Sequence, residues 1–117
     1  MTNPPASVFI QDSAARALFE RITGKWAALI VYALDERTKR FSELQREIEG
    51  VSQRMLSYTL KDLEAAGIIS RKQYPTVPPK TEYTLTPVGA TLVEPLRALC
   101  HWCEANQGDV KRSRQVQ

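Results

Sequence analysis

The chain has 117 residues, of which 43% are hydrophobic and 25% are charged, as in one soluble globular domain with a modest core. No apolar run approaches the roughly 20 residues that cross a bilayer. The first residues have neither the basic start nor the apolar segment of a signal peptide, so we expect a cytoplasmic protein without a membrane partner. The two cysteines are too few for a disulfide scaffold.

The net charge of +3 is concentrated in the middle of the chain. Residues 39–80 hold eight of the 16 basic residues but only five of the 13 acidic ones. The flanking segments 1–38 and 81–117 are each neutral overall. Excess positive charge on one part of a balanced domain is typical of a surface that binds a polyanion.

The N-terminal third predicts an arm and two helices. Residues 1–11 contain two prolines and little periodicity, and we expect a flexible arm there. Ser13 is a good N-cap for a first helix over residues 14–22, which Thr23 and Gly24 end. Residues 25–35 predict a second helix, because apolar residues recur at spacings of three and four. This second helix is expected at the centre of the core.

The next segment predicts a helical hairpin. Ser42-Glu43-Leu44-Gln45 has the spacing of a capping box and predicts a short third helix over residues 43–48. Gly50 and Val51 then form a tight turn before Ser52. Two short helices joined by a brief turn with glycine are typical of a helix-turn-helix, although any small helical domain can contain such a hairpin.

The helix that follows the turn has two contrasting faces. Ser52 is a good N-cap and Gly67 a good C-cap. Leu56, Leu60 and Leu63 form one apolar stripe between them. The opposite face has hydrogen-bonding and basic residues and no acid: Arg54, Ser57, Tyr58 and Lys61. Such a face suits DNA bases and phosphates, and the alternative is the ordinary solvated face of a core helix.

A β-hairpin pattern comes next. Residues 68–74 and 81–85 predict two strands, and the proline-rich segment 75–79 between them cannot be helical. A helix-turn-helix followed directly by a hairpin predicts a winged helix, in the mostly α branch of the α+β class. The hairpin carries cations that can follow DNA phosphates: Arg71, Lys72 and Lys80.

The C-terminal part predicts one long helix and a tail. Thr86 and Pro87 have the N-cap and first-position pattern for a helix over residues 88–105, which Pro95 would kink or divide. One stripe of this helix is apolar: Leu92, Leu96, Leu99 and Trp102. A complete winged core leaves little for this stripe to pack against, so it suits a dimer interface. We expect residues 12–106 to form one domain and residues 107–117 a disordered basic tail.

Several motifs resemble a known family. They are Gly24-Lys25-Trp26, Arg40-Phe41-Ser42-Glu43-Leu44, Val51-Ser52-Gln53, Leu60 to Ile68 (LKDLEAAGI), the wing sequence Tyr74 to Lys80 (YPTVPPK), and Glu82 to Thr86 (EYTLT) with Gly89. Across residues 13–102 the chain resembles the HxlR-type transcriptional regulators, bacterial winged-helix proteins related to the MarR group. The resemblance implies a homodimer on a palindromic DNA operator, with dimer contacts from the first and last helices.

One position departs from the family pattern. Many members carry a cysteine thirteen residues before the tryptophan of the Gly-Lys-Trp motif, and in some of them it senses oxidants. Here that position is Ser13. We therefore expect no redox switch at the first helix.

Other chemistry has weak support in the sequence. Cys100 and Cys103 form a CxxC pattern, but a zinc site needs two further ligands and His101, the sole histidine, points elsewhere on the helix. We interpret the two as core or interface cysteines, with thiol sensing as the alternative.

Lys25 is interpreted as a phosphate contact or a surface ion pair. We expect no cofactor or metal. One histidine and scattered acids cannot form a nucleophile, base and orienting group, so we expect no enzyme.

Two functional hypotheses remain. The first is a dimeric, sequence-specific DNA-binding regulator, with which control by a small-molecule effector is compatible. The second is a winged helix used for protein contact, which predicts an apolar or acidic outer face on residues 52–66. Under the first hypothesis the helix that begins at Ser52 enters the major groove and reads bases with Gln53, Arg54, Ser57 and Tyr58. Contacts to the DNA backbone are predicted for Lys39, Arg40, Ser42, Lys61, Arg71, Lys72 and Lys80. Ser52 at the helix start is a further predicted DNA-binding residue.

Overall fold

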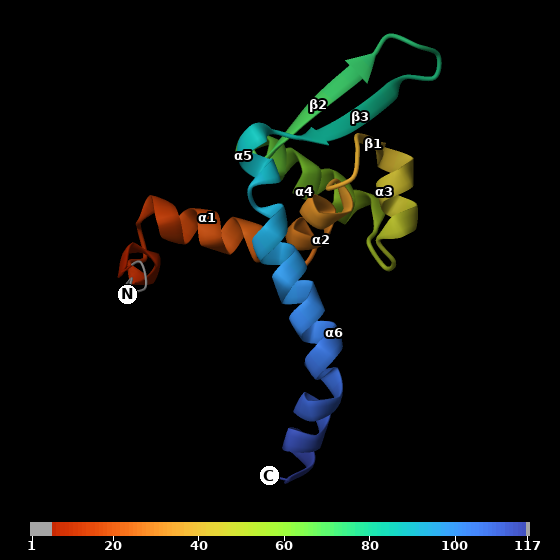
Figure 1. The fold of residues 1–117 in the computed structure, drawn as a ribbon. Helices are drawn as coiled ribbons and strands as arrows, with labels where there is room; N and C mark the ends of the chain where they lie inside the picture. Colours follow the sequence, from red (N-terminus) through yellow and green to blue (C-terminus); the bar gives the residue numbers. More distant parts are fainter. Residues whose placement is uncertain (1–5, 117) are drawn as a thin grey trace.

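A computed structural model describes residues 6–116, and Figure 1 shows their arrangement. The elements in chain order are a 3-10 helix Ala6–Phe9, α1 Ala14–Ile22, α2 Ala27–Ala33, β1 Lys39–Arg40, α3 Phe41–Glu47, α4 Gln53–Ala65, β2 Ile69–Tyr74, β3 Lys80–Leu85, α5 Pro87–Ala90 and α6 Val93–Val116. The fold is α+β and mostly α, which confirms the predicted class. None of the helices within residues 6–116 is long and apolar enough to cross a membrane.

The three strands of the described chain form one antiparallel sheet in the order β1-β3-β2. The wing is the β2–β3 hairpin, in which Ile69 pairs with Leu85 and Tyr74 with Lys80. It projects away from the helices (Figure 1). The two-residue strand β1 pairs with β3 at Tyr83 and Glu82 and was absent from the sequence prediction. So short a strand has no periodic signal of its own.

The core lies between α2, α3, α4 and the base of the wing. Ile30 and Val31 of α2 have no exposed surface, so the predicted central position of α2 is confirmed. The predicted stripe of α4 also points inward. The largest fully buried side chains are Ile30, Val31, Leu44, Leu56, Leu60, Leu63 and Ile69. Leu29 is the exception on α2, because 41% of its surface is exposed.

Most helix ends follow the capping rules. The Ser13 hydroxyl accepts a hydrogen bond from the Arg16 amide at 3.0 Å, and the Ser52 hydroxyl accepts one from the Met55 amide at 3.0 Å. Gly67 follows α4 with φ of +80°, a conformation that glycine adopts without a Cβ clash. The predicted limits of α1 and α4 are therefore correct to within about one residue.

The start of α3 differs from the prediction. Ser42 is not the N-cap; the helix begins at Phe41 after Arg40, and the Glu43 carboxylate accepts a hydrogen bond from the Arg40 amide at 3.0 Å. The cause lies in the sheet. Arg40 is paired with Glu82, so the chain is extended up to Arg40 and turns into the helix directly afterwards.

The C-terminal region contains two helices. The division falls at Thr91 and Leu92, before Pro95, which lies in the first turn of α6, where its missing N–H breaks no helical hydrogen bond. Helix α6 continues to Val116, so the prediction of a disordered tail from residue 107 is wrong for the part described. This segment contains no proline, and its several lysine, arginine and glutamine residues are good helix formers.

The base of the wing is fixed to α5. The Thr86 hydroxyl caps α5 by accepting from the Gly89 amide at 3.1 Å, and it donates to the Gly67 carbonyl at 2.6 Å. Gly89 is buried, and a Cβ at this position would overlap the backbone carbonyl of Ile68. This joint holds α5 directly against the residue that precedes β2.

Helices α1 and α6 extend away from this core in different directions (Figure 1). No residue of α1 is buried. The predicted arm lies partly outside the described residues, but residues 6–9 form a 3-10 helix instead of an irregular segment. The Ser13 hydroxyl donates to the Ile10 carbonyl at 3.0 Å and joins this turn to α1.

Candidate nucleic-acid interface

Helix α4 presents the outer face that its sequence predicts. Leu56, Leu60 and Leu63 are at most 1% exposed on the inner side. The predicted outward residues Gln53, Arg54, Tyr58 and Lys61 are exposed, and Ser57 is half-buried. Tyr58 has 67% of its surface exposed, so its phenol is free to meet a ligand.

Met55 is a residue that the sequence interpretation left out. It lies in the first turn of α4 and is 41% exposed. Its neighbours Arg54 and Tyr58 are both predicted base readers. An apolar side chain in this position suits contact with a thymine methyl group. Its position in the N-terminal turn of the helix could have marked Met55 as a candidate site residue. A methionine at one helical position, however, is found in cores as well as on binding surfaces, so the sequence alone does not decide between the two.

A hollow joins α4 to the wing. It has a volume of about 200 Å³ and is lined by Phe41, Ser57, Lys61, Glu64, Arg71 and Tyr83. Ser57 and Lys61 of α4 therefore share one continuous surface with Arg71 of β2. Glu64 places one acid at this surface, at the C-terminal half of α4. Burial raises the pKa of the Tyr83 phenol, and Arg71 acts in the opposite direction.

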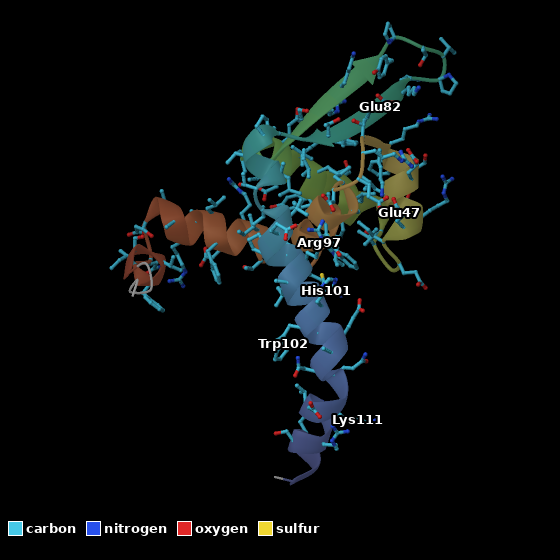
Figure 2. The ribbon with its side chains drawn as sticks, in the orientation of Figure 1. Glu47, Glu82, Arg97, His101, Trp102 and Lys111 are labelled. Atoms are coloured by element: carbon cyan, nitrogen blue, oxygen red, sulfur yellow. The ribbon has the colours of Figure 1, made fainter. Side chains whose placement is uncertain are left out.

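The wing cations gather around one aromatic ring. The ammonium groups of Lys72 and Lys80 lie 4.9 Å and 5.4 Å from the centre of the Tyr74 ring. The Tyr74 hydroxyl donates to the Glu82 carboxylate at 2.9 Å, and Lys80 forms an ion pair with Glu82 at 3.8 Å. Figure 2 marks Glu82 on the wing. The ring thus holds both lysines on one part of the hairpin, and Glu82 partly neutralises Lys80.

Lys39 is not part of this surface, and its burial does not support the predicted DNA contact. Its side chain is only 5% exposed, and its ammonium donates to the Glu47 carboxylate at 2.8 Å. The strand explains this burial, because successive residues of β1 point to opposite sides and only Arg40 of the two is exposed. Arg40 and Ser42 remain exposed at the start of α3, although Ser42 caps no amide there.

An ion pair stabilises the same helix start. Arg37 contacts the Glu43 carboxylate, which also accepts from the Arg40 amide. The hydrogen bond from Arg37 is the largest influence and the amide the second, and together they lower the pKa of Glu43 to about 2. Glu43 is therefore ionised at neutral pH, and its carboxylate is used to stabilise the start of α3.

The HxlR-like helix-turn-helix family model matches residues 21–111, most of the chain. This chain belongs to the HxlR family. YtfH of Escherichia coli strain K12, an HTH-type transcriptional regulator, is 42% identical over 104 residues, which cover 89% of this chain and 82% of YtfH. The match confirms the resemblance seen in the sequence motifs. The HxlR chain is a helix-turn-helix transcriptional regulator and not an enzyme.

Solved structures agree with this family assignment. The transcriptional regulator ytfH from Salmonella typhimurium has a TM-score of 0.87 at 39% identity, and the match covers 92% of this chain and 96% of that one. The redox regulator HypR in its reduced form has a TM-score of 0.77 at 37% identity, with 86% of this chain and 99% of HypR covered. This HxlR protein thus has the same fold as these two regulators over most of its length.

The thiols of this HxlR chain lie on α6. Cys100 is half-buried and Cys103 is exposed, and both are free. Ser13 caps α1, so its hydroxyl has a structural role there. Lys25 lies with its ammonium 4.8 Å from the centre of the half-buried Trp26 ring. Within residues 6–116, no group of three potential metal ligands comes together.

Proposed function

We propose that this regulator binds duplex DNA in a sequence-specific manner, with α4 in the major groove and the wing on the neighbouring backbone and minor groove. The observation that carries the proposal is the hollow beside the wing. It places Ser57, Lys61 and Arg71 on one surface, next to the exposed first turns of α4. Exposed donors on a helix of this size suit the major groove, which admits one α-helix.

The proposed roles follow from position on α4. Gln53, Arg54, Ser57 and Tyr58 lie in the first two turns, and N-terminal residues of a recognition helix reach the bases. Arg54 can donate two hydrogen bonds to a guanine, and Gln53 can pair with an adenine. The proposed backbone contacts are Arg40, Ser42, Lys61, Arg71, Lys72 and Lys80. Ser52 caps the helix that carries the readers, and Lys39 holds α3 in place through Glu47.

We also infer that the regulator acts as a homodimer on a palindromic operator in the bacterial cytoplasm. Leu18 and Phe19 of α1 are 44% and 49% exposed, and Leu99 and Trp102 of α6 are each 56% exposed. Figure 2 shows Trp102 projecting from α6 on the side toward which α1 extends. A second copy would cover these side chains. Two copies related by a two-fold axis then read half-sites about 34 Å apart.

The test begins with selection of an operator from random duplexes, followed by anisotropy titrations on that operator and on a scrambled duplex. Arg54→Ala should cost about 1–3 kcal/mol on the operator and little on the scrambled duplex, because base contacts carry specificity. Lys80→Ala should weaken both duplexes alike and make the salt dependence shallower by about one unit for each phosphate that the protein no longer neutralises. Arg112→Ala, at the far end of α6, removes the same single charge as a matched control and should change neither.

Two results would contradict the proposal. Equal weakening of both duplexes by Arg54→Ala would remove this arginine from base reading. Equal effects of Arg54→Ala and Arg112→Ala would show that only the total charge matters, and the assignment of α4 as the reading helix would fail.

A further inference from the structure

A second and larger cavity lies where α2, α3 and α6 meet. Its volume is about 600 Å³, within the range of roughly 300–1,000 Å³ for small-molecule sites. It is lined by Leu29, Tyr32, Ala33, Asp35, Glu36, Lys39, Glu47, Ile48, Glu49 and Arg97. It shares no residue with the hollow beside the wing.

The cations of this cavity are already paired. Lys39 donates to Glu47 at 2.8 Å, and Arg97 donates to Asp35 at 2.5 Å. Figure 2 places Glu47 on α3 and Arg97 on α6. A carboxylate ligand would have to displace one of these acids before it could reach a cation. The two pairs therefore disfavour an anionic ligand.

Two further acids of the lining have no such partner. Glu36 and Glu49 are exposed, and neither forms an ion pair with any residue between 6 and 116. The remaining charge of the cavity is therefore negative. An ammonium group placed between these carboxylates would make charge-assisted hydrogen bonds, which are stronger than neutral ones.

The other walls define the rest of the ligand. Leu29, Tyr32, Ala33 and Ile48 provide apolar and aromatic surface. Lys39 is 5% exposed, and its ammonium has three hydrogens but one acceptor among the described residues. A hydroxyl or carbonyl oxygen on the ligand would find a free donor there.

We propose that this cavity binds a small organic cation, an amine with an aromatic or aliphatic body and a neutral oxygen. The site also adjoins the DNA-reading helix, because Glu47, Ile48 and Glu49 lead within a few residues to Ser52, the N-cap of α4. Another wall of the cavity is Arg97 of α6. A ligand that contacts both walls changes how α4 lies relative to α6, and so changes the affinity for DNA. This second step rests on the proposed function.

Three probes with one phenol body separate the charge of the ligand from its shape. They are tyramine, which is a cation, tyrosol, which is neutral, and phloretate, which is an anion. Isothermal titration calorimetry without DNA should show one tyramine per chain. Tyrosol and phloretate should bind about tenfold more weakly or worse, because neither can donate the charge-assisted hydrogen bonds of an ammonium group.

Variants locate the site. Glu36→Gln with Glu49→Gln should weaken tyramine about tenfold or more, and because both side chains are exposed the fold should be unchanged. Asp12→Asn with Glu104→Gln makes the same change of charge at exposed positions outside the cavity and should leave tyramine binding unaltered. Saturating tyramine should then shift the operator affinity of the wild type at least threefold and leave that of the Glu36/Glu49 variant unchanged.

The outcomes are distinct. Tighter binding of phloretate than of tyramine would overturn the ligand class, and unchanged binding by the Glu36/Glu49 variant would overturn the location. Binding of tyramine with no change in operator affinity would overturn the link to α4. A protein that binds the operator but none of the probes would overturn this site and leave the proposed function standing. A protein that binds tyramine but no DNA would overturn the proposed function and leave this site standing.

Discussion

Two apolar stripes of this molecule have the same helical spacing but different surroundings. Leu56, Leu60 and Leu63 of α4 are at most 1% exposed, because α2 and the base of the wing cover them. Leu99 and Trp102 of α6 are each 56% exposed. The core of the chain therefore covers the whole α4 stripe but only the first half of the stripe that continues along α6, Leu92 and Leu96. Leu99 and Trp102 are left for a further surface, which we propose to be a second copy.

The largest expected effect concerns the covered stripe. Leu60→Ala should lower the free energy of unfolding by roughly 2–5 kcal/mol, through lost burial and a cavity in a packed core. Urea unfolding at two protein concentrations measures it. The loss should be the same for the monomer and the dimer, because Leu60 contacts only its own chain. A loss below about 1 kcal/mol would contradict the tight packing around α4.

The uncovered stripe should behave differently. Trp102→Ala should weaken the dimer by about 2 kcal/mol or more, or roughly thirtyfold, as for a buried aromatic residue at an interface. Light scattering over a dilution series should show dissociation at higher concentrations than for the wild type. His101→Ala, at the neighbouring exposed position on another face of α6, is the control.

A wild type that is already monomeric at micromolar concentration would contradict the dimer itself. Leu96 is not a clean site for this test, although the sequence places it on the same stripe. It is 8% exposed and belongs to the core of its own chain. A charge there would destabilise the fold before it affected association.

A smaller expected effect is a loss of stability at low pH. It sharpens the comparison because it arises at the start of α3, at the edge of the core that covers the α4 stripe. The pKa of Glu43 is lowered from 4.5 to about 2 in the folded protein. A lowered pKa stabilises the folded state fully above the ordinary value, and this contribution is lost as the pH falls toward 2. Urea unfolding between pH 7 and pH 2 should therefore show the difference between wild type and Glu43→Gln shrinking below about pH 4.5. A difference that stays constant would mean that Arg37 and Glu43 do not interact in solution.

The smallest expected effect is that of oxidants. Ser13 occupies the position where many HxlR-type regulators carry a cysteine, which in some of them senses oxidants. Mild diamide treatment should therefore leave the operator affinity unchanged. Any response would have to come from Cys100 or Cys103 on the uncovered helix. Anisotropy titrations with the wild type and the Cys100→Ser, Cys103→Ser variant decide this. A wild-type response that the variant lacks would place a thiol sensor on α6.

The local rules predicted the elements whose signals lie within one segment. The caps at Ser13 and Ser52 and the stripe of α4 required only neighbouring residues. The errors share a different cause. Arg40, rather than Ser42, precedes α3 because it pairs with Glu82, more than forty residues away. The same strand turns Lys39 inward to Glu47, and no local pattern contains that information.

The candidate site was predictable to a similar extent. The outward residues of α4 followed from helical periodicity alone. The hollow between α4 and the wing, and the cavity at α2, α3 and α6, depend on how separate elements pack. The exposed state of Leu99 and Trp102 also could not be read from spacing, since periodicity identifies an apolar face but not what covers it.

The joint at Gly89 has a consequence for how the regulator fits DNA. Helix α5 is pressed against the backbone before β2, and only Thr91 and Leu92 separate it from α6. The wing therefore has little freedom to swing independently of the helix proposed to pair the two copies. In a dimer, a change in the angle at which the two α6 helices cross would therefore change the distance between the tips of the two wings. The angle between the two α6 helices would then determine the length and the twist of the operator that a dimer can bind.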